Sequence, residues 1–296
     1  MEQSELEKWR QAGKLGTETL AYAKSITKQG MSLLELTEKI EDYVEKKGAK
    51  FAFPVNLSKD EIAAHFSPQH NSEDKAEGLL KIDLGISIDG YISDLSCSID
   101  LTSDKKYTKL IEASQKALDE AIKLIKPGQE LGVIGKKIQE TISKYGFAPV
   151  VNLSGHELKQ YLLHAGLTVP NYDNGNTTKL KEGMVLAIEP FATNGQGLIQ
   201  DGNVSGIYKF EAKHNTRDME SRKVLEFIEQ EYKELPFSGR WLIKKFGTRA
   251  IFSLRALEQV NAIHQFKQLV EKTKMPVSQA EATVLVTNTG CEILAK

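Results

Sequence analysis

The sequence predicts an α+β protein made of two related halves, in which helices cover antiparallel sheet. One observation is a β-hairpin pattern at residues 79–101, and another is an internal duplication of a helix-helix-strand unit. The third is the stretch 193–264, where charged, helix-like sequence interrupts the second copy. We therefore expect a main domain formed by residues 1–192 and 265–296, and a mostly helical insertion subdomain at 193–264.

The composition excludes several classes of protein. The chain has 296 residues, 40% of them hydrophobic and 27% charged, and its net charge of −1 gives no general attraction to nucleic acid or membrane surfaces. Two cysteines, Cys97 and Cys291, cannot form a disulfide framework and suit a reducing compartment. Residues 1–16 lack the apolar core of a signal peptide, and no run is long enough to span a bilayer. We therefore expect a cytoplasmic protein that binds neither membranes nor specific DNA, and as a separate expectation we take it to be a monomer.

The N-terminal part predicts two amphipathic helices followed by a strand. Residues 4–7, Ser-Glu-Leu-Glu, have the pattern of a capping box and are expected to open the first helix. The second is expected to begin at Ser32, with a glutamate three residues on, and to stop at Gly48. Residues 51–58, FAFPVNLS, then predict a strand that leads into a polar loop with His65.

Residues 79–101 contain two alternating runs joined by Asp89-Gly90, a sequence typical of a tight hairpin turn. If these two residues form the loop, position 83 lies opposite position 96. Because side chains alternate along a strand, Asp83 and Asp94 then share one face, with Cα atoms roughly 7–8 Å apart. Two carboxylates on a buried face need a cation between them, and two divalent metal ions would serve. A hairpin with both aspartates in water is the plainer alternative.

After the hairpin the first pattern returns. Helices are expected at about 106–125 and 131–145, and Val-Asn-Leu-Ser, present at 55–58, recurs at 151–154. Matching residues of the two helical pairs, such as Gly48 and Gly146, keep a constant offset of 98 residues. The unit is too long and occurs too few times for a solenoid, so it predicts two pseudo-symmetric halves.

In the interrupting stretch, helices are expected at about 218–234 and 251–265, before an apolar strand resumes at Glu281. Five basic residues and no acid lie between Pro236 and Leu257: Arg240, Lys244, Lys245, Arg249 and Arg255. A solvated helix face is the plainer interpretation, and a docking surface for an acidic or nucleic-acid partner is the alternative.

Three more polar residues stand where a strand would be apolar or just after one. His156 follows the second Val-Asn-Leu-Ser, Glu189 interrupts MVLAIEPF, and Glu281 begins EATVLVT. Any one of them alone would be read as a half-exposed polar residue, since a lone buried carboxylate is costly. With Asp83 and Asp94 they form a set of four carboxylates and one imidazole, which suits Mn, Fe, Co or Zn better than a thiolate site does.

The order of these motifs resembles the pita-bread metallopeptidases, and among them the type II methionine aminopeptidases of the archaeal form. The matching stretches are AFPVNLSKDEIAAHFSP, LLKIDLGISIDGYISDL, NLSGHELKQYLLHAG, VLAIEPFAT, LPFSGRWL and VSQAEATVLVT, and they span nearly the whole chain. The resemblance implies the pita-bread fold, with two pseudo-symmetric halves of antiparallel sheet covered by helices and a helical type II insertion.

The resemblance also implies a reaction, the removal of the initiator methionine from nascent proteins and peptides by a metal-bridging hydroxide. Substrates would be N-termini that begin with Met, which places the protein near the ribosome. Two divalent metal ions, Co, Mn, Fe or Zn, would be held by these ligands, with the second and the last bridging them: Asp83, Asp94, His156, Glu189 and Glu281.

Further roles follow from the same resemblance. Glu189 would accept and pass on the proton, His164 would stabilise the carbonyl oxygen, and His65 would contact the scissile nitrogen. The residues implied to line an apolar slot for the methionine side chain are Phe53, Pro54, Leu163, Phe191, Ile207 and Phe266.

The chain departs from the family pattern at a few positions. It has Ala280 and Ala282 where Phe and His are usual, Leu95 where Thr is usual, and Ser87 in place of a common His. We expect altered packing beside Glu281 and the loss of a hydroxyl near the metals.

Two alternative functions are weighed against this one. An aminopeptidase P or prolidase would carry a substantial N-terminal domain before the hairpin, whereas the residues preceding Asp83 belong to the first repeat. A pita-bread protein that has lost catalysis and binds RNA or ribosomes would lose metal ligands, and all five are present. Salt-sensitive RNA binding without metal would favour the second alternative.

Overall fold

The computed structural model describes residues 1–214, 216 and 218–296. The first half contains α1 (Gln3–Ile26), α2 (Leu33–Lys46), β1 (Lys50–Lys59), β2 (Ile62–Ala64), β3 (Leu79–Ile88) and β4 (Tyr91–Asp100). The second half contains α3 (Thr108–Ile122), α4 (Leu131–Lys144), β5 (Ala148–Pro149), β6 (Ser154–Leu158), β7 (Thr168–Pro170), β8 (Val185–Ile188), β9 (Phe191–Thr193), β13 (Val277–Gln279), β14 (Ala282–Val286) and β15 (Cys291–Ala295). Between β9 and β13 lie β10 (Ile199–Phe210), α5 (Met219–Glu231), β11 (Phe237–Ser238), α6 (Gly239–Phe246), α7 (Ala250–Gln259) and β12 (Ile263–Glu271).

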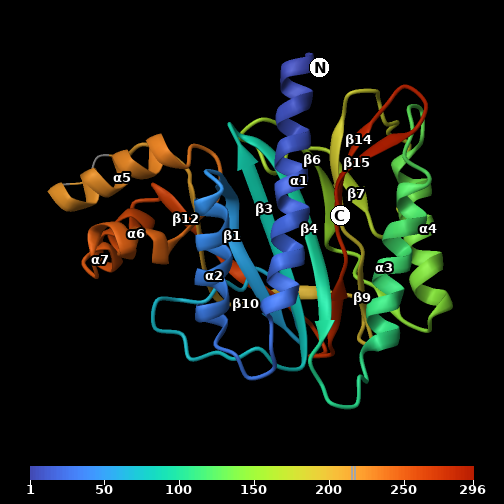
Figure 1. The fold of residues 1–296 in the computed structure, drawn as a ribbon, viewed down its shortest axis with the longest axis horizontal. Helices are drawn as coiled ribbons and strands as arrows, with labels where there is room; N and C mark the ends of the chain where they lie inside the picture. The colour runs from blue at the N-terminus through green and yellow to red at the C-terminus, as the bar shows by residue number, and fades with distance from the viewer. Residues whose placement is uncertain (215, 217) are drawn as a thin grey trace.

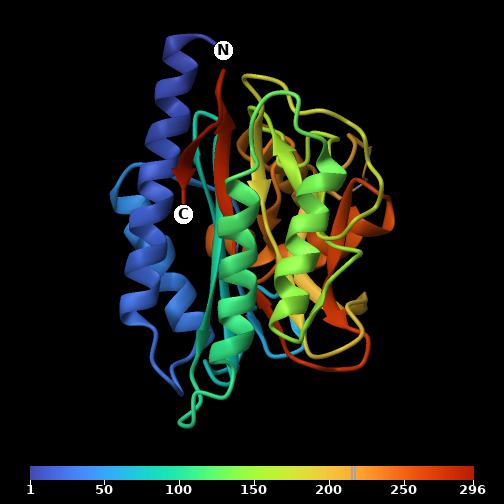
Figure 2. The same ribbon diagram turned by 90° about the vertical axis from the view of Figure 1, so that its right-hand side faces the viewer.

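The helices pack on antiparallel sheets, as an α+β fold requires. One sheet has the order β1-β3-β4 and another the order β15-β14-β8-β6-β7. Figure 1 shows α1 crossing in front of β3 and β4, with α5, α6 and α7 gathered at the left edge. In Figure 2, α1 and α2 stand together on one side, and α3 and α4 face the viewer. Within the described part of the chain, no helix combines the length and the apolar character needed to cross a bilayer.

The starts of the first two helices show how local sequence sets their boundaries. The capping box of α1 is formed by Glu2 and Glu5, so the expected start at residues 4–7 was wrong by two positions. At α2 the prediction is confirmed, because the Ser32 side chain accepts a hydrogen bond from the Glu35 backbone N–H. The chain leaves α2 through Gly48, whose φ of 73° favours glycine.

The hairpin β3–β4 has the predicted register, in which Asp83 pairs with Ser96 and Gly85 pairs with Asp94. The alternate residues of β3 are buried beneath α1 and α2, in a core cluster that includes Leu80, Ile82, Leu84 and Ile86. Asp83 therefore points to the opposite face, because successive side chains of a strand alternate. A bridge between Ser96 and Glu281 then joins this sheet to the strands of the second half.

The stretch between β9 and β13 has its own core but is not purely helical. Its apolar side chains form a cluster that includes Leu225, Phe237 and Leu254. The expectation of a helix at 251–265 was wrong at its end, because α7 stops at Gln259 and Ile263–Glu271 pairs with β10. In this segment the backbone N–H and C=O groups are satisfied by pairing with β10 and not within a helix.

Candidate metal centre

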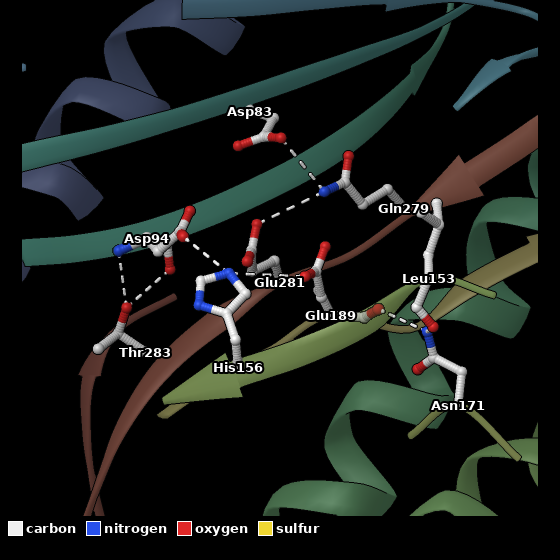
Figure 3. A network of polar contacts seen from close by, with 9 residues as sticks. All are labelled: Asp83, Asp94, Leu153, His156, Asn171, Glu189, Gln279, Glu281 and Thr283. Carbon is white, nitrogen blue, oxygen red and sulfur yellow. Dashed lines mark hydrogen bonds and ion pairs between the residues drawn. The ribbon is translucent and has the colours of Figure 1, made fainter. Parts of the chain in front are cut away.

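Five polar side chains from five separate segments converge between the two halves (Figure 3). Asp83 comes from β3 and Asp94 from β4, His156 comes from β6, Glu189 follows β8, and Glu281 precedes β14. The sequence predicted all five as a set, and the structure brings them to one cavity.

The distances between these groups are short enough for shared ligands. Single ligand atoms of Asp94, His156 and Glu281 all lie within 4.8 Å of one another. The Nε2 atom of His156 is 3.5 Å from Asp94 Oδ2 and 3.7 Å from Glu189 Oε1. Asp83 is connected through the Gln279 amide, whose Nε2 lies 3.4 Å from Asp83 Oδ2 and 3.5 Å from Glu281 Oε2.

The charges of this centre lack a counter-ion among the described residues, since no lysine or arginine there forms an ion pair with its four carboxylates. Several buried polar atoms also have no hydrogen-bond partner in the described part of the chain, namely Asp83 Oδ1, His156 Nδ1, Ser96 Oγ and Gln279 Oε1. Native proteins rarely leave buried polar groups unpaired. The donor set and its unpaired atoms therefore fit divalent metal ions.

Burial dominates the titration of the centre. It raises the pKa of Asp83 to about 7. Burial, followed by the neighbouring carboxylates, raises the pKa values of Asp94, Glu189 and Glu281 well above their usual range. Burial has the opposite effect on His156 and lowers its pKa to about 3, so the imidazole is neutral and able to act as a ligand. A cation in the centre would favour the charged carboxylates.

Two side chains hydrogen-bond to the backbone of candidate metal ligands and hold them in position. The Thr283 hydroxyl accepts a hydrogen bond from the Asp94 backbone N–H and donates one to the Asp94 carbonyl, both at 2.7 Å. The buried Asn171 side chain donates to the carbonyls of Leu153 and Glu189, at 3.1 and 3.2 Å. These contacts hold the backbone at Asp94, within β4, and at Glu189, just after β8 (Figure 3).

The centre lies at the polar end of a cavity of about 320 Å³ whose remaining wall is largely apolar. Of the residues implied to bind the methionine side chain, all but one line it: Phe53, Leu163, Phe191, Ile207 and Phe266. His65 and His164 line it as well. The His164 ring packs edge-on against His156, with centroids 4.3 Å apart, and the His65 ring packs against Phe266 at 5.5 Å.

Pro54 is the exception, because it is not among the residues that line this cavity. It neighbours Phe53 on β1, and successive side chains of a strand point to opposite faces. The structure adds Asn56 and Asn152 to the wall, which sequence reasoning did not assign. The sequence could have indicated both residues, because they occupy equivalent positions in the two Val-Asn-Leu-Ser segments.

Three of the departures from the family pattern, Leu95, Ala280 and Ala282, lie in apolar core clusters. Leu95 is buried in the cluster beneath α1 and α2, so the expected loss of a hydroxyl near the metals was wrong: this position lies on the other face of the hairpin. Ala280 and Ala282 join the core with residues of α3 and α4, and the expected change in packing beside Glu281 stays a prediction. The Ser87 hydroxyl accepts a hydrogen bond from the Gly90 backbone N–H and supports the turn.

The structure also alters the interpretation of the basic segment between Pro236 and Leu257. Arg240 is buried and paired with Glu41, so it takes no part in a solvent-facing patch. Lys245 lies over the Phe227 ring, with its Nζ atom 4.4 Å from the centroid. These contacts favour a structural interpretation of both side chains.

Comparison with known proteins agrees with this geometry. The family model "Metallopeptidase family M24" matches residues 7–241. A methionine aminopeptidase of Methanocaldococcus jannaschii is 40% identical over 298 residues, covering 100% of both chains. Among solved structures, that of a thermophilic Arx1 has a TM-score of 0.85 at 15% identity, covering 100% of this chain and 91% of that one. That of a methionine aminopeptidase from Rickettsia prowazekii has a TM-score of 0.71 at 21% identity, covering 100% and 98%.

Proposed function

Because this chain belongs to metallopeptidase family M24 and removes N-terminal methionine as a metal-dependent hydrolase, we propose that this hydrolysis takes place in the acidic centre described above. Four carboxylates and one imidazole that converge at the polar end of an apolar cavity carry the proposal. The pita-bread fold of its structural neighbours agrees with the two-halved sheet. The identity over the full length of the methionine aminopeptidases also disfavours a prolidase.

We propose that two divalent metal ions, drawn from Co, Mn, Fe and Zn, would be held in this centre by Asp83, Asp94, His156, Glu189 and Glu281. In Figure 3 Glu281 lies between Asp83 and His156, and Asp94 lies beside His156, with Asp94 Oδ2 3.5 Å from His156 Nε2. When bound, divalent ions supply Lewis-acid chemistry, which lowers the pKa of water and polarises a carbonyl.

The protein's own groups would move protons and orient the peptide. Glu189 lies against His156 in the centre, and its raised pKa suits a carboxylate that takes a proton and passes it on. His164, exposed beside His156, would donate to the carbonyl oxygen of the scissile bond. His65, whose pKa burial lowers to about 4, would remain neutral and contact the scissile nitrogen.

The apolar wall would receive the methionine side chain. Phe53, Leu163 and Phe191 are buried there, and an unbranched thioether adapts well to such a lining. The polar end would then meet the free amine and the first peptide bond. This arrangement supports removal of one residue from a free N-terminus.

Other expectations remain proposals. We propose that residues 193–264 form an insertion subdomain, apart from residues 215 and 217, which lie outside the described residues. Its separate core cluster supports this. We further propose a cytoplasmic monomer acting on nascent N-termini near the ribosome, which agrees with the unpaired Cys97 and Cys291.

The test is release of free methionine from Met-Ala-Ser by metal-stripped protein to which Co, Mn, Fe or Zn is returned. Gly-Pro-Pro-Ala serves as the control peptide, and Asp94→Asn as the control protein. Cleavage of the Met peptide alone, by wild type and only with metal, would support the proposed site. Full activity of Asp94→Asn would contradict the ligand assignment. A folded protein that cleaves nothing with any metal would point to a binding protein on this fold.

A further inference from the structure

A buried ion pair joins the α5–α7 region to the first half of the molecule. The Arg240 guanidinium, on α6, donates hydrogen bonds to both carboxylate oxygens of Glu41 on α2, and the Nη1–Oε2 distance is 2.8 Å. The Trp241 indole N–H donates to the same carboxylate at 2.7 Å. Arg240 is only 5% exposed, so this is a desolvated, two-pronged contact rather than a surface salt bridge.

A surface groove borders this pair. A groove of about 780 Å³ lies between α2, the hairpin turn and the end of α5. The other polar contacts across it are exposed: Lys50 pairs with Glu231 at 2.6 Å, and Lys233 lies 3.4 Å from the centroid of the Tyr161 ring. Exposed pairs of this kind contribute little to holding two elements in place. Of the ion pairs described along this groove, that of Glu41 with Arg240 is therefore the buried one.

A short, rigid path connects the anchor to the cavity wall. The Ser238 hydroxyl accepts a hydrogen bond from the Arg240 backbone N–H and caps α6. Ser238 pairs with Ile207 across β11 and β10, and both Ile207 and the nearby Pro236 line the cavity. A shift of Arg240 would thus be passed to the wall over a few residues of paired strand and capped helix.

We propose that Glu41, which does not line the cavity, is a positioning residue for substrate recognition. Through Arg240 it holds the wall formed by Ile207 and Pro236 at the separation from Phe53 and Leu163 that a methionine side chain requires. The inference rests on the proposed function, since it assumes that this cavity receives the methionine. It assigns the ion pair a role in binding and none in the chemical step.

The first test is Glu41→Gln, which keeps the shape of the side chain and removes its charge. Losing an interaction that binds ground state and transition state equally raises KM and leaves kcat unchanged, so we expect KM for Met-Ala-Ser to rise about tenfold while kcat stays within about twofold. Arg240→Lys keeps the charge but loses the bidentate hydrogen-bonding geometry, so its KM should lie between those of wild type and Glu41→Gln. The effects of Glu41→Gln and Arg240→Lys on KM should be non-additive in the double variant.

The chain offers a matched control. Arg10 also donates two hydrogen bonds to one carboxylate, that of Glu292, but this pair is exposed and links α1 to β15. Glu292→Gln should leave KM and kcat unchanged. A purely structural role for Glu41 would lower the melting temperature and leave KM of the folded protein as it was.

Backbone hydrogen exchange provides a readout independent of activity. We expect faster exchange at residues 206–208 and 237–241 in Glu41→Gln, and no change there in Glu292→Gln. Unchanged exchange or unchanged KM in Glu41→Gln would overturn the proposal. If the wild type neither releases nor binds methionine, the proposed function fails, and exchange still decides whether Glu41 holds the wall.

Discussion

Thr283 shows how one hydroxyl can replace a strand partner. Near the junction of β4 and β14, its oxygen accepts from the Asp94 backbone N–H and donates to the Asp94 carbonyl. The two bonds cross from the second half of the molecule to the first. Groups that hydrogen-bond to a metal ligand and fix its orientation contribute strongly to metal affinity.

We therefore expect Thr283→Val, a change of nearly equal volume, to weaken Mn²⁺ binding by roughly 10–100-fold. Calorimetric titration of metal-stripped protein would measure it. Thr141→Val is the control. It removes the hydrogen bond that the Thr141 hydroxyl donates to the Lys137 backbone carbonyl, far from the centre. Equal affinity in both variants would show that Asp94 needs no such anchor.

The raised carboxylate pKa values predict proton release on metal binding. Below about pH 7 part of the Asp83 population is protonated, and the other three carboxylates titrate well above their usual range. A metal binds the charged forms, so protons must leave. Titrations at pH 6.5 in buffers of different ionisation enthalpy should give different apparent heats, and Mn²⁺ affinity should rise with pH. Heats independent of buffer would contradict the raised pKa values.

At the scale of elements, α1 approaches the sheet closely because it carries a glycine at the contact. A Cβ atom added at Gly13 would lie 2.1 Å from the Leu294 carbonyl oxygen, and this backbone atom cannot rotate away. The helix covers β4 and β15 at this point. Close helix–sheet approach is thus decided by one small residue.

Gly13→Ala sets two effects against each other. Alanine favours a helix by about 1 kcal/mol, whereas overpacking costs about 1–3 kcal/mol, and a 2.1 Å contact with backbone places this site at the costly end. We expect a net loss of stability of about 1–2 kcal/mol in urea unfolding. Lys14→Ala, at the exposed neighbouring position, should be close to neutral. A stabilised Gly13→Ala would mean that α1 can move off β15.

At the scale of the whole molecule, the metal centre takes its ligands from both halves. Asp83 and Asp94 belong to the first, and His156, Glu189 and Glu281 to the second. Without a cation, the charged forms of these carboxylates repel one another across the junction between the two halves. Because the pKa of Asp83 is raised, the stability present at low pH with this group protonated is lost as pH rises through about 7, and the raised pKa values of the other carboxylates act in the same direction. The histidines do not reverse this above pH 6.5, because their lowered pKa values leave them neutral.

A bound metal ion should therefore cross-link the two halves and stabilise the folded protein. At a free concentration of 100 times Kd, Mn²⁺ should add about 2.7 kcal/mol, or roughly 5–10 °C in melting temperature, and a chelator should reverse the shift. Asp94→Asn provides the control: with one charge fewer, its metal-free form should melt above metal-free wild type at pH 8, and Mn²⁺ should shift it little. Equal metal-induced shifts in both proteins would place the binding site elsewhere.

What the sequence determined by itself rests on short-range patterns. Period-two alternation and Asp89-Gly90 specify the register that puts Asp83 and Asp94 on one face, and a polar residue in or beside an apolar strand marks His156, Glu189 and Glu281. Such signals are local, because strand geometry and turn chemistry act over a few residues. The duplication adds the two-halved plan in the same way.

Only the tertiary structure decided which distant groups meet. Arg240 belongs to a basic run by sequence, yet its partner Glu41 lies 199 residues away and buries its charge. The same holds for Leu95, which turns toward α1 and away from the centre, and for the end of α7, where pairing with β10 replaces helix. Desolvation and long-range pairing decide these outcomes, and both depend on neighbours that no local pattern specifies.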